Sequence, residues 1–264
     1  MQEILERKQI KNIDFNIDLA QSFGIYKNNA EFSLLDYASS VNISCGFHAG
    51  DPMTIKNALL KAKEKGVVVG AHIGYDDIQG FGYRPVELSA DELEALVIYQ
   101  VGALMSFAKT MNMEIEHVRP HGAMYRRAAE DYVFAKNIAK AVKKCSQWLV
   151  YYGASGDVTA SVGDEVNIPI AHEVHLEKTY NTDGTIDFER KDNENIFASI
   201  NRLKTLLATS QIDNVAGGKT CVIADTIHFS NKIAIAQALI KQSKDLIVPV
   251  PVNYKNACLS GWVE

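Results

Sequence analysis

Residues 42–52 of this chain read NISCGFHAGDP, which joins the end of a strand, a turn of small residues and the start of a helix. The apolar run at 41–45 predicts a buried strand. Asp51 followed by Pro52 is typical of a helix start, with aspartate as the N-cap and proline at the first helical position. His48 lies between the two, where small residues let a ligand approach the backbone. The stretch therefore predicts a β/α unit with a polar site at the carboxyl end of its strand.

The same alternation of short apolar runs and amphipathic stretches continues along the chain. The clearest helix covers 90–111, where apolar residues recur every three or four positions and Ser89 and Glu92 predict a capping box. The strands read as continuous apolar runs, as expected when helices cover a sheet. Strands are predicted at residues 12–17, 41–45, 67–71, 115–118, 148–152, 167–171, 220–224 and 246–250. Helices are predicted at residues 32–39, 52–65, 90–111, 132–144, 194–209 and 231–243.

This alternation contains no low-complexity linker, so it predicts one domain over residues 1–264 with a closed or strongly curved parallel sheet. A TIM-like α/β barrel with seven or eight strands is the preferred fold, and an open doubly wound sheet is the alternative. In either fold, ligands bind at the carboxyl ends of the strands.

Composition excludes several classes of protein. A net charge of −5 argues against a nucleic-acid-binding protein, which normally carries a basic patch. No stretch of about 18 uncharged apolar residues predicts a membrane span, and no apolar signal-peptide core follows the N-terminus. The four cysteines form no C-x-x-C pair, which favours free thiols and a cytoplasmic location.

Polar side chains recur at the ends of the predicted strands. Asp18 follows the first strand, and Asp225 follows the strand predicted at 220–224. The histidines at or near strand ends are His48, His72, His117 and His121. Because the carboxyl ends of parallel strands meet at one end of a sheet, we expect these side chains to converge on one mouth.

Two interpretations of this convergence stay open. Asp18, His72 and His121 could bind a divalent metal, since neutral imidazole and carboxylate are ligands of zinc, iron and manganese. They could instead form a metal-free network in which histidine acts as an acid or base near neutral pH.

Two arginines are candidates for binding an anion. Residues 79–84, QGFGYR, predict a glycine-hinged loop in which Arg84 is either a carboxylate clamp or a solvated residue. Arg119 lies inside a strand-end motif and is the better candidate. Asp51 is first of all a helix cap, although the same helix N-terminus could attract an anionic group.

Two short segments resemble known motifs without matching them. GGKT at 217–220 lacks the first glycine of a phosphate loop and leads into a predicted strand, where a phosphate loop would open a helix. GASGD at 153–157 is one glycine short of a nucleophile elbow. Neither a phosphate-binding loop nor a serine hydrolase is therefore predicted.

At the strand ends the chain resembles the LamB/YcsF family. DFNIDL at 14–19 resembles the family's D-L-N-A-D-L-G-E, and residues 42–52 match A-N-I-A-C-G-F-H-A-G-D-P closely. Residues 70–84 follow G-A-H-P-G-Y-P-D-L-Q-G-F-G-R-R, and 118–125 follow V-K-P-H-G-A-L-Y. The resemblance implies a distorted barrel of seven β/α units, similar to the polysaccharide-deacetylase and YdjC-like superfamily. In YdjC-like proteins an aspartate and two histidines hold a metal, and the matching positions are Asp18, His72 and His121.

The family includes one component of the prokaryotic 5-oxoprolinase, its A subunit. The resemblance thus implies ATP-dependent opening of 5-oxo-L-proline to L-glutamate with subunits B and C, which would complete the ATP site. Asp18, His72 and His121 would activate water or a metal. His48 is the candidate general acid–base, and Arg119 would bind the substrate carboxylate or an oxyanion. The candidate substrate-binding residues are Asn16, Asp51, Arg84 and Asp225.

The chain also departs from the family pattern. Gln21 replaces a glutamate, Arg119 a lysine and Ile223 a histidine, and Glu177 and Lys178 stand where the family usually has aspartate and arginine. The first half of the site is therefore intact and the second half is remodelled. Two alternatives stay open, a metal-dependent deacetylase or amidohydrolase acting alone and a non-catalytic regulatory partner.

Overall fold

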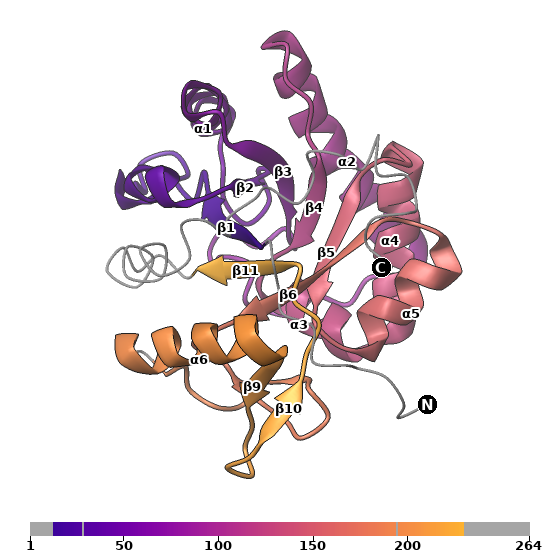
Figure 1. Cartoon of the computed structure of the whole chain (residues 1–264). Coiled ribbons are helices and arrows are strands. Elements are labelled where there is room, and N and C mark those ends of the chain that lie inside the picture. Colours follow the sequence, from indigo (N-terminus) through magenta and orange to yellow (C-terminus); the bar gives the residue numbers. More distant parts are fainter. Residues whose placement is uncertain (1–12, 28, 194, 230–264) are drawn as a thin grey trace.

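The computed structural model describes residues 13–27, 29–193 and 195–229, and its centre is a closed barrel of parallel strands (Figure 1). The prediction of a seven-stranded TIM-like barrel is confirmed, and the alternative of an open sheet is wrong. Around the barrel the strands are β1 (Asp14–Leu19), β2 (Ser40–Ser44), β3 (Val68–Ile73), β4 (His117–Pro120), β5 (Val150–Ala154), β6 (Ile170–His175) and β11 (Thr226–Phe229).

Helices connect successive strands and cover the outside of the barrel (Figure 1). The helix predicted at 52–65 is confirmed, and Asp51 caps it by accepting from the N–H groups of Met53 and Thr54. The capping box of Ser89 and Glu92 is also present. The helices are the 3-10 helix η1 (Asn29–Tyr37), α1 (Pro52–Lys65), α2 (Ala90–Thr110), α3 (Gly122–Glu130), α4 (Tyr132–Cys145), α5 (Asp157–Val166) and α6 (Ile196–Thr209).

The predictions are wrong at several boundaries. The strand expected at 220–224 is not part of the barrel, because β10 (Lys219–Cys221) pairs antiparallel with β9 (Gln211–Asp213) in a separate hairpin. The barrel strand β11 follows this hairpin. A second hairpin joins β7 (Thr179–Tyr180) and β8 (Ile186–Asp187), and β6 extends to His175, well past the predicted end. The strand predicted at 246–250 and the helix at 231–243 lie outside the described residues.

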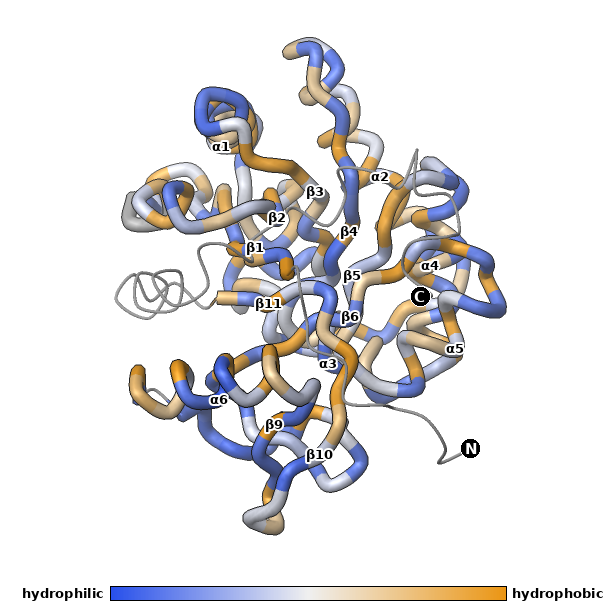
Figure 2. Tube along the Cα trace, in the orientation of Figure 1, coloured by the Kyte–Doolittle hydropathy of each residue, from blue (hydrophilic) through white to orange (hydrophobic). Residues whose placement is uncertain are grey.

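The barrel strands β1, β2 and β11 alternate between apolar and polar residues, and for them the prediction of continuous apolar runs is wrong. In β1, Phe15 and Ile17 pack into the core outside the barrel, whereas Asp14 and Asn16 bond to residues of other strands across its interior. Figure 2 shows hydrophilic residues in blue and hydrophobic residues in orange along the strands of the barrel. Buried polar side chains are tolerated there because they satisfy one another through hydrogen bonds.

The polar interior of the barrel is layered. At the amino end, the Asp14 carboxylate accepts hydrogen bonds from the hydroxyls of Ser40 and Tyr152, at 2.8 and 3.2 Å, and burial raises its pKa. One layer further, His117 Nε2 lies 2.8 Å from Asn42 Oδ1, and its ring stacks on Tyr152. The prediction that His117 joins the other histidines at the mouth is therefore wrong. His117 begins β4, whereas the other three lie at or beyond the carboxyl ends of their strands.

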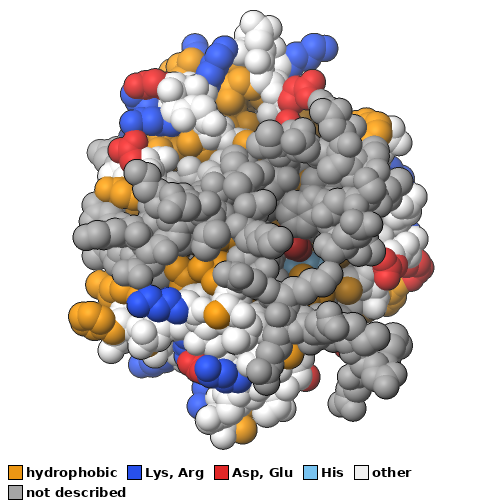
Figure 3. Space-filling model, viewed as in Figure 1, with side chains coloured by type: hydrophobic (Ala, Val, Ile, Leu, Met, Phe, Trp, Pro, Cys, Tyr) orange, Lys and Arg blue, Asp and Glu red, His pale blue; other side chains and the backbone are white. Residues whose placement is uncertain are grey.

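No helix of the described residues is long and apolar enough to cross a membrane. On the face shown in Figure 3, Lys and Arg side chains of the described residues lie beside Asp and Glu side chains. Of the four cysteines, Cys45, Cys145 and Cys221 are free thiols, and Cys258 lies outside the described residues.

Candidate metal and catalytic site

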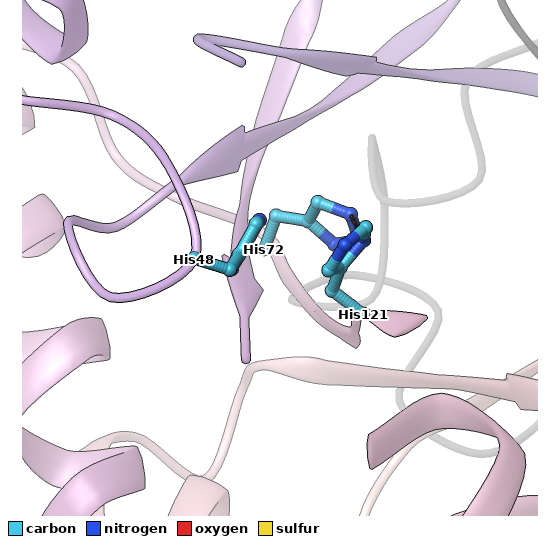
Figure 4. A group of neighbouring side chains, drawn as sticks. All are labelled: His48, His72 and His121. Carbon is cyan, nitrogen blue, oxygen red and sulfur yellow. Dashed lines mark hydrogen bonds between the residues drawn. The ribbon is translucent and has the colours of Figure 1, made fainter. Parts of the chain in front are cut away.

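Four of the predicted site residues meet at the carboxyl end of the barrel. Asp18 comes from β1, His72 from β3, and His121 follows β4 directly, while His48 lies in the turn between β2 and α1. The ring centroid of His121 lies 4.1 Å from that of His48 and 4.8 Å from that of His72. Figure 4 draws these three side chains. The Asp18 Oδ1 atom is 3.3 Å from His72 Nε2. The structure brings these four residues together, and their chemical roles stay predictions.

The hydrogen bonds of His72 and His121 determine which ring atoms carry protons. His72 Nδ1 lies 3.1 Å from the carbonyl oxygen of Arg119, and His121 Nε2 lies 2.7 Å from that of Phe81. Because a carbonyl only accepts, both of these nitrogens must carry hydrogen. In neutral rings the other two nitrogens, His72 Nε2 and His121 Nδ1, then face each other with lone pairs at 3.0 Å. An additional proton or a cation is needed between them.

The protonation states suit a metal. Burial lowers the pKa of His121 to about 3 and holds that of His48 well below its usual value, so both rings are neutral at pH 7. Burial alone would raise the pKa of Asp18, but His72, His228 and Arg119 hold it well below its usual value. Metals bind neutral imidazole and ionised carboxylate, and main-chain carbonyls commonly orient the ligating rings. The ligand atoms of His48, His72 and His121 lie within 4.8 Å of one another, and Asp18 Oδ1 lies 3.3 Å from His72 Nε2, so these histidines together with Asp18 fit a divalent cation.

The loop at 77–84 packs directly on these histidines. Gly82 adopts φ +72°, and a Cβ atom there would lie 2.8 Å from His121 Cδ2 and 2.9 Å from His48 Cβ. Arg84 bonds to Asp77 through Nε, at 2.8 Å, and through Nη2. Its side chain is 62% exposed and does not line the cavity of the site. The geometry assigns Arg84 to holding the loop, against its prediction as a substrate clamp.

Arg119 links two carboxylates at the base of the mouth. Its Nε and Nη2 atoms donate to Glu173 at 2.8 and 2.7 Å, and Nη1 lies 3.4 Å from Asp18 Oδ1. Its Cζ atom lies 4.8 Å from the ring centroid of Tyr125. Such a fork needs the planar guanidinium, which a lysine cannot replace. The arginine at this position therefore holds Glu173 and Asp18 in place.

A cavity of about 680 Å³ opens over this mouth. Asp18 and His121 line it, whereas His48 and His72 are not among its described lining residues. A general acid–base must reach the substrate. The ring of His48 stacks on that of His121 and is not among the described lining residues, so its position does not support the predicted acid–base role. The other polar residues at the floor of the cavity are Arg119, Tyr125, His175, Glu177 and His228.

Two further predicted residues support the site from outside the cavity. Asn16 is fully buried, and its Nδ2 atom donates to Glu173 Oε1 at 3.0 Å and to Thr226 Oγ1 at 2.6 Å. These bonds occupy both donors, so Asn16 positions Glu173 and does not contact substrate. Asp51 caps α1 and also accepts from the N–H of Gly24 at 2.9 Å.

The prediction that Asp225 belongs to the mouth is wrong. Asp225 precedes β11 and therefore lies toward the amino end of that strand. Its Oδ2 atom accepts from the backbone N–H of His172 at 2.8 Å and lies 3.0 Å from His172 Nδ1. Asp225 and His172 thus form a separate pair.

Among the polar residues at the mouth, the sequence did not predict a site role for Glu173 and His175 on β6, His228 on β11, Tyr125 or Glu177. Residues 173, 175 and 177 are Glu, His and Glu, so polar residues occur at every second position, as on one face of a strand. This alternation is visible in the sequence, but the strand was predicted to end at residue 171, before the alternation begins. His228 was missed because the strand predicted in this region covered 220–224 and ended before β11 begins.

Comparisons with known proteins identify the family of this chain. The LamB/YcsF family model matches residues 13–249. The A subunit of 5-oxoprolinase from Tolumonas auensis is 38% identical over 81% of this chain and 87% of that protein, and its counterpart from Bacillus subtilis is 36% identical over 88% and 93%. The crystal structure of a lactam utilization protein from Thermus thermophilus is 31% identical, covers 89% of this chain and 98% of that one, and superposes with a TM-score of 0.83. The chain therefore belongs to the LamB/YcsF family.

Proposed function

We propose that this chain is the A subunit of a 5-oxoprolinase, which opens the lactam ring of 5-oxo-L-proline to give L-glutamate and hydrolyses ATP. The observation that carries the proposal is the buried group of Asp18, His72 and His121 at the edge of a cavity large enough for a small substrate. The relatives from 5-oxoprolinases and the lactam utilization protein support the choice of substrate.

The reaction breaks the amide C–N bond of the ring and forms a C–O bond from water, and the ring nitrogen gains a proton. Asp18 and His121 are the members of the group that line the cavity, so they are placed to act on water and substrate. In the metal-free protein, His121 and His72 act as a pair that takes up a proton from water between Nδ1 and Nε2, which lie 3.0 Å apart, and returns it to the ring nitrogen.

Arg119 supplies positive charge at the floor of the cavity. Its bonds to Glu173 and Asp18 fix its position, and it attracts the carboxylate of 5-oxoproline. A divalent cation held by Asp18, His72 and His121 would add Lewis-acid polarisation of the lactam carbonyl.

The coupling to ATP is assigned to partner subunits B and C. The GGKT segment lies in the hairpin of β9 and β10, where Lys219 begins a strand. A phosphate loop would instead open a helix and present free N–H groups there. We therefore expect ATP hydrolysis to require the complete assembly.

The test is co-expression of this chain with the neighbouring subunits and measurement of glutamate release from 5-oxoproline with and without ATP. The expected result is ATP-dependent release by the co-purified complex and none by the isolated chain. Hydrolysis of 5-oxoproline by the isolated chain would contradict the need for partners. Metal-dependent, ATP-independent amide hydrolysis by that chain would instead identify an amidohydrolase acting alone, and an active complex insensitive to changes at His121 would indicate a regulatory role.

A further inference from the structure

A second group of metal-binding side chains lies in the same mouth, opposite the three histidines. His175 ends β6, Glu177 follows it, and His228 lies on β11. All three are buried, and their ligand atoms lie within 4.8 Å of one another. We propose that His175, Glu177 and His228 form a second divalent-cation site, separate from the group of Asp18, His72 and His121.

Glu173 orients His175 for this role. The Glu173 Oε2 atom lies 2.9 Å from His175 Nε2, so this nitrogen carries the hydrogen and, in the neutral ring, Nδ1 is left with its lone pair. A carboxylate behind a histidine is a common support for a metal ligand. The Nδ1 atom lies 3.6 Å from Glu177 Oε1, which is long for a hydrogen bond. Two ligands at about 2.1 Å from one ion in tetrahedral geometry lie roughly 3.4 Å apart, close to that separation.

His228 provides an independent observation. Its side chain is 8% exposed, and neither ring nitrogen makes a hydrogen bond of good geometry with a described residue, although Nε2 lies 3.2 Å from Asp18 Oδ1. A buried polar group left unsatisfied costs about 1–3 kcal/mol, so such groups require an explanation. A cation coordinated by one of these nitrogens explains why the ring is buried here.

The charges of the mouth favour an additional cation. Three carboxylates, those of Asp18, Glu173 and Glu177, are buried around Arg119, which is the one buried arginine among the described residues; Arg126, Arg127 and Lys178 also line the cavity but are more exposed. Buried charges are normally paired or coordinate metals. A proton on His175 would offset only part of this excess, whereas a divalent cation balances it.

Asp18, a member of the first group, lies beside the second group as well. Its Oδ1 atom lies 3.3 Å from His72 Nε2 and 3.2 Å from His228 Nε2, so one carboxylate connects both sets of histidines. Imidazole and carboxylate ligands suit zinc, cobalt or manganese better than magnesium or calcium. The inference concerns cation binding alone and stands whether or not the substrate is 5-oxoproline.

The test measures metal content of the full-length chain. The protein is stripped with a chelator, loaded with Co²⁺ and desalted, and cobalt per chain is determined by elemental analysis together with the visible absorption spectrum. Glu177→Gln and His228→Gln are expected to lose about one equivalent relative to the unaltered chain. His172→Gln is the matched control, since it alters a buried, carboxylate-paired histidine outside the mouth and should keep the full content.

Equal cobalt content in the unaltered chain and both variants would overturn the proposal, as would an unaltered chain that retains no cobalt. If the variants do not fold, as judged by circular dichroism, anomalous scattering from crystals of the cobalt-loaded chain decides. An anomalous peak in contact with Glu177 and His228 supports the site, and its absence refutes it. His121→Gln gives a further control, because it should leave this peak in place.

Discussion

His121 Nδ1 lies 3.0 Å from His72 Nε2, and each ring uses its other nitrogen to donate to a main-chain carbonyl. In two neutral rings these nitrogens would face each other with lone pairs. The arrangement therefore favours a proton or a cation bound between them. The barrel creates this relationship because β3 and β4 are neighbours and their ends bring the two side chains together.

Replacing His121 by Ala is expected to leave the barrel folded and to lower 5-oxoproline turnover by the assembled complex about 100- to 10,000-fold. The physical reason is loss of the one cavity-lining histidine of the first group. Steady-state glutamate release gives the rate, and circular dichroism controls for folding. Near-normal turnover in a folded variant would show that His121 is structural.

Gly82→Ala should disturb the site more than the fold. Its Cβ would collide with His121 and His48, whereas Gly66→Ala meets open space at a similar φ of +66°. Both variants carry the cost of a left-handed alanine, of order 1 kcal/mol. Only Gly82→Ala should also lose about one equivalent of cobalt, that of the first group, and most of its turnover. Equal effects of the two variants on cobalt binding would show that the loop does not constrain the histidines.

Arg119→Met is expected to destabilise the chain by about 3–5 kcal/mol, because it removes the guanidinium that pairs with the fully buried carboxylate of Glu173. The matched control is Lys144→Met, which breaks an exposed pair with Glu94 and should cost less than about 1 kcal/mol. Urea unfolding measures both. Adding Glu173→Gln to Arg119→Met should recover part of the loss, and a failure to do so would argue against coupling of the pair.

The pH dependence of stability should contain a contribution from His117. Burial lowers its pKa to about 3 from the ordinary 6.5, so below pH 6.5 the unfolded chain binds a proton that the folded chain does not. Stability is therefore lost as pH falls from 6.5 toward 3, at about 1.4 kcal/mol per pH unit for this group. His117→Gln should show a correspondingly shallower loss in urea unfolding between pH 7 and 5. Identical slopes would mean that His117 is protonated in the folded protein.

Local signals in the sequence were sufficient for the barrel and for the first group of site residues. The N-cap at Asp51 and the capping box at Ser89 depend on neighbouring residues alone, and the structure confirms both. Asp18, His72 and His121 could be placed together because each follows or ends a strand, and parallel strands present their carboxyl ends on one side.

Tertiary structure alone decided which polar residues join them. Closure of the barrel brings β11 between β1 and β6, and the register pairs His228 with His175. That pairing joins strands far apart in the chain, and a shift of one position in either strand would turn its side chain to the outside. Asp225 and His117 both lie toward the amino ends of barrel strands and therefore away from the mouth, although both stand near predicted strand ends. Strand signals are local, whereas register in a closed sheet depends on packing around the whole barrel.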